Sequence, residues 1–107
     1  MKLIIAIVQD EDSSRLIGQL MNDGFGVTKL ATTGGFLMSG NTTFLVGTED
    51  NRVDDVIAII EKHSKKRTQM VPSTASYGVG MYTSFPVEVK VGGATIFVID
   101  VERYEKL

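Results

Sequence analysis

The chain begins with two segments whose apolar residues follow different spacings. Leu3 to Val8 is apolar at every position, which is typical of a strand buried on both faces. Asp12 or Ser13 then predicts the cap of a helix. The apolar residues of this helix recur at helical spacing, namely Leu16, Ile17, Leu20 and Met21. Asn22-Asp23-Gly24 predicts that the helix ends with the help of a glycine.

The next part of the chain predicts two more strands and then a second helix. Val27 to Thr33 is rich in β-branched residues and predicts a second strand, and Thr42 to Gly47 predicts a third. Between them lies a glycine-rich connection from Gly34 to Gly40. Asp50 or Asn51 predicts the cap of a second helix. The apolar side of that helix consists of Val53, Val56, Ile57 and Ile60.

The last third of the chain predicts a long loop and a terminal hairpin. Residues 68–86 have no periodicity, and we expect a long flexible loop there. Val87 to Val91 alternates as a half-exposed strand, Gly92-Gly93 predicts a two-residue turn, and Ala94 to Val101 would return as its partner. The whole order predicts an α+β fold: a ferredoxin-like βαββαβ sandwich with an additional C-terminal hairpin strand, in a single domain over residues 1–107.

Two of the predicted strands are apolar at consecutive positions, which indicates that both of their faces are covered. These segments are Leu3 to Val8 and Ile96 to Ile99. Two helices cover only one face of so small a sheet, so the other face needs a second cover. Another copy of the chain is the simplest one. The alternative is that the loop at 68–86 folds over the open face.

Composition narrows the function classes. The 107 residues fit one domain, and 11 basic against 13 acidic residues give a net charge of −2, without the basic stripe that long DNA or RNA contacts need. There is no cysteine, which excludes disulfides and thiolate metal sites. The run from Leu3 to Val8 is too short for membrane insertion and is not followed by a signal cleavage site. We therefore expect a cytoplasmic protein.

Few side chains are suited to catalysis or to metal binding. His63 is the single histidine, and it lies among lysines near the end of the second predicted helix, where it would complement the helix dipole. Asp10, Glu11 and Asp12 could bind a hard cation, but acidic residues at a helix start commonly serve the helix itself. We expect no enzyme activity, no metal and no cofactor.

The segment TKLATTGGFLMSGNTT at 28–43 is the most informative part of the chain. Its two adjacent glycines allow successive backbone N–H groups to converge on an anion. Phe36 and Leu37 offer an apolar surface to a purine, while Thr28 and Asn41 can hydrogen-bond to base, ribose or phosphate. This combination indicates a nucleotide site, although it matches neither the Walker A nor the G-x-G-x-x-G pattern. The alternative is an ordinary glycine loop anchored by a phenylalanine.

At this segment the chain resembles a known family. TKLATTGGFL at 28–37, followed by GNTTF at 40–44, closely resembles the PII-like cyclic di-AMP receptor proteins, as does PVEVKVGGATIFV at 86–98. The resemblance implies a homotrimeric signal-transduction receptor with cyclic di-AMP in each intersubunit cleft. It also implies that binding reorders long loops, which then meet an effector protein. By match of motif, the implied ligand-binding residues are Thr28, Gly35, Phe36, Leu37, Asn41, Gly47 and Gly92, the last from across the interface.

The resemblance also implies how these residues divide the ligand between them. Phe36 and Leu37 would pack against adenine, Thr28 would read it, and Gly35 with Asn41 would meet the phosphodiester.

Two related alternatives are PII-like trimers that bind ATP or ADP and CutA-like trimers that bind a metal ion. An acylphosphatase-type hydrolase is a third, but it would need an arginine in a glycine loop, which the sequence lacks.

The sequence differs from these proteins at three places. Gly24 and Gly26 stand where relatives tend to carry a polar and a basic residue. The loop at 68–86 is short, and the tail at 102–107 does not resemble the ending of close relatives.

Overall fold

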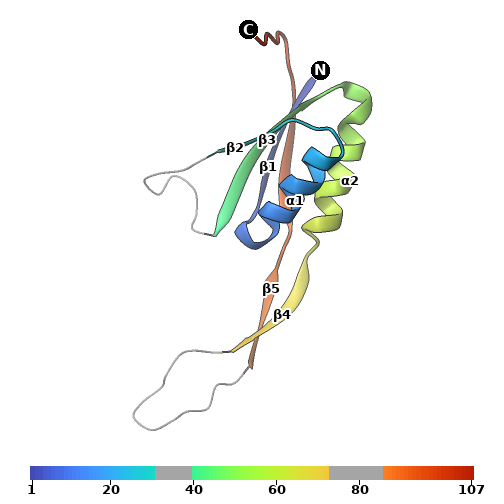
Figure 1. Ribbon diagram of the computed structural model, residues 1–107. Helices are drawn as coiled ribbons and strands as arrows, with labels where there is room; N and C mark the ends of the chain where they lie inside the picture. Colours follow the sequence, from blue (N-terminus) through green and yellow to red (C-terminus); the bar gives the residue numbers. More distant parts are fainter. Residues whose placement is uncertain (31–39, 73–85) are drawn as a thin grey trace.

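The strand–helix–strand units predicted from the sequence assemble into two antiparallel sheets and one helical layer (Figure 1). The computed structural model describes residues 1–30, 40–72 and 86–107, without the side chains of residues 71 and 72. Its elements are β1 (Lys2–Gln9), α1 (Asp10–Asn22), β2 (Val27–Leu30), β3 (Asn41–Thr48), the short 3-10 helix η1 (Asp50–Arg52), α2 (Val53–His63), β4 (Arg67–Pro72), β5 (Pro86–Val91) and β6 (Ala94–Asp100).

The larger sheet has the strand order β2-β3-β1-β6, with every neighbouring pair antiparallel. The central strand β1 sets the register, because Ile4 lies opposite Val46 of β3 and Val98 of β6. Helices α1 and α2 lie on the same side of this sheet (Figure 1). The prediction of a ferredoxin-like α+β fold is therefore confirmed.

The core lies between the sheet and the two helices, and strand alternation decides which residues enter it. Ile4, Ala6 and Val8 of β1 are buried, whereas Leu3, Ile5 and Ile7 between them point to the other face and are only half-buried. The remaining core residues are Leu16, Leu20, Phe25, Phe44, Val46, Val56 and Ile60. Burial of these side chains is the main source of stability of the domain.

Neither helix begins where the sequence predicted. The first helix starts at Asp10, so Asp12 and Ser13 lie inside its first turn and neither caps it. At the second helix, Asp50 and Asn51 belong to η1, and α2 follows directly at Val53 without a side-chain cap. The capping residues lie within three positions of the observed helix starts. Asp12 itself is buried in a tertiary ion pair, described below, that the local sequence does not reveal.

The predicted terminal hairpin is wrong in its pairing. β5 pairs with β4, which begins at Arg67 opposite Val91, whereas β6 joins the larger sheet beside β1. Gly92 and Gly93, with φ near +89° and +90°, form the break between the two sheets rather than a hairpin turn. Alternation identified each strand, but it carries no information about which strand is the partner.

Part of the predicted loop at 68–86 is also a strand. β4 extends to Pro72 and β5 starts at Pro86, so these two strands form an arm that projects from the end of the larger sheet (Figure 1). The polar start of β4, at Arg67, Thr68 and Gln69, hid this strand from a hydrophobicity pattern. The rest of the predicted loop, residues 73–85, lies outside the described residues.

The face of the larger sheet opposite the helices carries no second layer among the described residues. Leu3, Ile5 and Ile7 of β1 lie on it, and the edge strand β6 adds Phe97 and Ile99, which are 53% and 46% exposed. We call this surface the open face. It is the uncovered apolar face that the continuous apolar strands predicted.

Candidate functional site

Three of the residues predicted to bind ligand share the open face. Asn41 and Gly47 are six positions apart on β3, so alternation places them on the same side, opposite Gln9 and Leu3 of β1. Thr28 on β2 lies opposite Leu45 and belongs to the same face. Gly35, Phe36 and Leu37 lie outside the described residues. The structure thus gathers every described β2 and β3 residue of the predicted set on the one surface without a helical layer.

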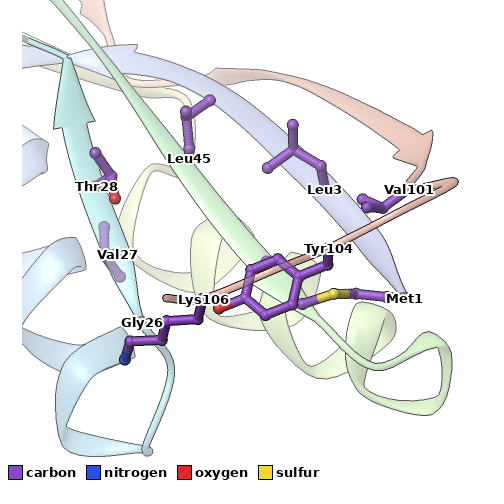
Figure 2. A pocket seen from close by; sticks show the side chains of 10 residues that line it. Met1, Leu3, Gly26, Val27, Thr28, Leu45, Val101, Tyr104 and Lys106 are labelled. Atoms are coloured by element: carbon purple, nitrogen blue, oxygen red, sulfur yellow. The ribbon is translucent and has the colours of Figure 1, made fainter.

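A hollow of about 490 Å³ lies at one end of the open face, which is within the usual range for a small-molecule site. It contains Thr28 and Gly47 of the predicted set, and Figure 2 shows its other walls. The floor comes from the sheet, and the C-terminal tail crosses above it. The lining residues are Met1, Leu3, Gly26, Val27, Thr28, Leu45, Gly47, Val101, Tyr104 and Lys106.

Most of this lining is apolar or backbone, so its few polar groups determine what it can bind. Thr28 supplies a hydroxyl, and Tyr104 supplies a ring with a phenolic hydroxyl. The Met1 ammonium lies 2.9 Å from the Asp50 carboxylate, and this hydrogen bond holds the pKa of Asp50 below its usual value. Among the described residues that line the hollow, Lys106 is the one side chain with a formal charge.

Gly47 keeps the hollow open. Its backbone is in the ordinary extended region, and the nearest atom to an added Cβ would be Met1 Cε at 3.4 Å, an ordinary contact. The backbone therefore does not require glycine at this position. A larger side chain would instead fill part of the hollow.

The other end of the open face brings Asn41 close to Gly92. Both line a smaller hollow of about 270 Å³ with Lys66 and residues of β1 and β6. The Gly92 N–H donates to Gln9 Oε1 at 2.7 Å, and Gln9 lies opposite Asn41 in the register. Asn41 is four positions from Leu45 along β3, so it lies roughly 13 Å from the level of Thr28. The predicted residues thus occupy two places on a single subunit.

Gly92 has a structural reason to be glycine. Its φ of +89° is a conformation that side chains disfavour, and an added Cβ would meet the Lys65 carbonyl oxygen. The N–H of the next residue, Gly93, donates to the Ser64 carbonyl. The tight crossing between α2 and the arm accounts for the glycine without a ligand.

The acidic segment after β1 is divided among internal contacts. Asp12 is fully buried and accepts two hydrogen bonds from Arg67, at 2.8 and 3.4 Å. This pairing raises the pKa of Arg67, with Glu11 contributing from 3.7 Å. Asp10 accepts a hydrogen bond from Thr42 at 2.5 Å. Within the described part of the chain, no three acidic or histidine side chains are grouped so as to hold a metal ion.

Two further polar residues complete the picture. His63 is the last residue of α2, in the helical layer and away from the open face. Thr43 lies in the same β3 column as Asn41 and Gly47, and its buried Oγ1 has no hydrogen-bond partner among the described residues. The sequence motif contains Thr43, and alternation along β3 places it on the same face as Asn41 and Gly47.

Comparison with known families identifies the family of the chain. A family model described as cyclic-di-AMP receptor matches residues 1–107, which is the whole chain. The chain belongs to the cyclic-di-AMP receptor family. The family expected from TKLATTGGFL and GNTTF is thus confirmed over a range that also includes the divergent tail.

A solved structure agrees with this assignment at the level of the fold. This chain is similar to a functionally unknown protein from Pediococcus pentosaceus ATCC 25745, whose crystal structure matches it with 44% sequence identity and a TM-score of 0.77. The match covers 99% of this chain and 96% of that one. Neither described helix is long and apolar enough to cross a bilayer.

The sequence missed the contribution of the C-terminal tail to the hollow. Val101, Tyr104 and Lys106 all line it, yet none was predicted as a site residue. The tail has no periodicity from which its contacts could be predicted. Those contacts depend on the path of the chain after β6. The only local signal was an aromatic residue, Tyr104, in an otherwise polar segment.

Proposed function

We propose that this chain binds cyclic di-AMP on the open face of its larger sheet and acts as a receptor rather than as an enzyme. The observation that carries the proposal is the co-location of Thr28, Asn41 and Gly47 on the one sheet face without a helical layer. Membership of the cyclic-di-AMP receptor family supports this ligand. The hollow of about 490 Å³ beside Thr28 supports the location.

The proposed binding unit is a homotrimer. Phe97 and Ile99 on the edge strand β6 remain about half exposed, and such an apolar edge strand is a surface that proteins normally cover. A second copy on this face would cover it. It would also bring the Gly92 end of one subunit towards the Thr28 end of another, which fits a ligand that contacts both.

Within this unit the ligand contacts follow the residue chemistry. Thr28 would hydrogen-bond to an adenine edge, and Asn41 would donate to a ribose or phosphodiester oxygen. Phe36 and Leu37 would pack against the base, while the Gly35 N–H would meet the phosphodiester. Gly47 would leave room for the ligand, as its open position in the hollow suggests.

The regulatory part of the proposal concerns the segments 31–39 and 73–85. Along the chain, the first connects β2 to β3 and the second connects β4 to β5. We propose that binding of cyclic di-AMP changes these segments in the cytoplasm and so controls the contact with an effector protein.

Calorimetric titration of the purified chain with cyclic di-AMP, cyclic di-GMP and ATP tests the proposed ligand. Saturable binding of cyclic di-AMP alone, at one ligand per subunit, is the expected result. Gly47→Val should weaken this binding by filling the hollow, whereas Gly18→Val on the exposed side of α1 should not. Preferential binding of ATP would favour the alternative, a PII-like trimer for ATP or ADP.

A further inference from the structure

The tail that follows β6 crosses the hollow instead of leaving the domain. The Val101 N–H donates to the Met1 carbonyl at 3.2 Å, which fixes the start of the tail at the end of β1. Further along, Tyr104 and Lys106 line the same hollow as Thr28 and Gly47. In Figure 2 the tail passes over the sheet, and the Lys106 side chain extends towards the turn that holds Gly26. Two residues of the tail thus face the space proposed for the ligand.

The charge of this space comes from the tail. The sheet contributes Leu3, Val27 and Leu45, which are apolar, and Thr28, which is neutral. Lys106 is the only charged side chain among the lining residues, and no ion pair of the described residues involves it. A ligand with anionic groups in this hollow would find one free cation, and that cation is Lys106.

Tyr104 provides a second feature that suits a nucleotide. Its ring lines the hollow yet stays 60% exposed, so it is not fully used by packing within the chain. Large aromatic side chains left exposed beside a polar group are well suited to stack on a base. The tail thus carries an aromatic ring that can stack on a base and, two positions later, an unpaired ammonium group that can bind a phosphate.

We propose that the C-terminal tail completes the nucleotide site, with Lys106 as the cation that meets a phosphodiester and Tyr104 as an aromatic wall against a base. This inference rests on the proposed function, because cyclic di-AMP carries two anionic phosphodiesters and two purines. Lys106 is exposed, so its contribution is screened by salt. It therefore sets affinity at low ionic strength more than at high ionic strength.

The test is calorimetric titration of cyclic di-AMP into the full chain and into Lys106→Gln, Lys106→Arg and Lys62→Gln. Lys62 is the matched control, since it is an exposed lysine in the helical layer, away from the open face. Lys106→Gln should bind about five- to fiftyfold more weakly than the parent, since a charged hydrogen-bond donor is lost. Lys106→Arg should retain most of the affinity, and Lys62→Gln all of it.

Ionic strength separates a charge effect from a packing effect. The Debye length falls from about 10 Å at 0.1 M to about 3 Å at 1 M salt, so the gap between parent and Lys106→Gln should narrow across that range. Tyr104→Ser should weaken binding roughly tenfold at both salt concentrations, whereas Tyr104→Phe should keep the ring and most of the affinity. Sedimentation and circular dichroism of each variant should match the parent.

The outcomes distinguish this inference from the function on which it rests. A parent that does not bind cyclic di-AMP refutes the proposed function, and the inference with it. If the parent binds cyclic di-AMP and Lys106→Gln binds it as tightly as the parent at both salt concentrations, the inference alone is refuted. An equal loss in Lys62→Gln also overturns it, because the effect would then come from net charge rather than from the hollow.

Discussion

Phe97 on the edge strand β6 offers the sharpest test of the proposed self-association. Its side chain is 53% exposed and lies on the open face opposite Ile5 of β1. Phe97→Ser removes most of the apolar area that a second copy would cover at this position. Because the change lies on the sheet surface rather than in the core, we expect the variant to fold but not to assemble into the trimer.

The size of the effect follows from the exposed area. A phenylalanine side chain buries about 200 Å² when fully covered, so about 100 Å² of Phe97 is left for an interface. At about 25 cal/mol per Å², that area is worth about 2.5 kcal/mol per subunit and about 7.5 kcal/mol per trimer. The upper limit is therefore a loss of about five orders of magnitude in the trimerisation constant.

Sedimentation at micromolar concentration measures this directly. The parent should sediment as one species near three times 11.7 kDa, and Phe97→Ser near 11.7 kDa. Met21→Ser is the matched control, because Met21 is 61% exposed but lies on α1, in the helical layer. A Phe97→Ser variant that sediments like the parent would refute the interface, and a monomeric parent would refute self-association altogether.

Three further predictions concern the arm and the ligand loop. Gly92→Ala should lower the free energy of unfolding by about 2 kcal/mol, because its φ is positive and the added Cβ would clash with the Lys65 carbonyl oxygen. Gly18→Ala in α1 should raise the free energy of unfolding by about 0.5–1 kcal/mol, and urea unfolding measures both. Arg67→Ala should destabilise by about 2–3 kcal/mol, because it leaves the buried Asp12 carboxylate with only the more distant Arg15, at 3.8 Å. Asp12→Ala should cost only about 1 kcal/mol, because the 40% exposed Arg67 side chain regains water; the reverse order in urea would contradict this. Phe36→Ala should weaken cyclic di-AMP binding about ten- to a hundredfold in calorimetry without changing sedimentation, and parent-like affinity would place the base elsewhere.

The sequence was sufficient for the layers of the fold. The apolar run from Leu3 to Val8 predicted a strand, and β1 forms there between β3 and β6. The helical spacing of Leu16 with Leu20, and of Val56 with Ile60, identified helix residues that are fully buried. These predictions succeeded because periodicity reports directly on which side of an element faces the core.

Strand partners were less predictable, for a physical reason. Val87 to Val91 and Ala94 to Val101 were both recognised as strands, and the two intervening glycines favoured a hairpin. In the structure β5 pairs with β4 instead, and an ion pair between Arg67 and buried Asp12 links the start of β4 to α1. Such a contact joins residues 55 positions apart, so no local pattern contains it.

The candidate site shows the same division between local and distant information. Thr43 and Gly47 could be assigned to one face from the sequence, because an even separation along a strand places two residues on the same side. Asn41 joins them because β3 begins one residue before the predicted strand. The proposed role of Lys106 could not be inferred in this way, because it depends on the direction the tail takes after β6, where the Val101 N–H donates to the Met1 carbonyl. The strands form the floor of the hollow, and the tail adds part of its wall and a charged side chain. Two homologues that share the β2–β3 motif but differ in their tails should thus offer a base the same floor while differing in their affinity for its phosphates.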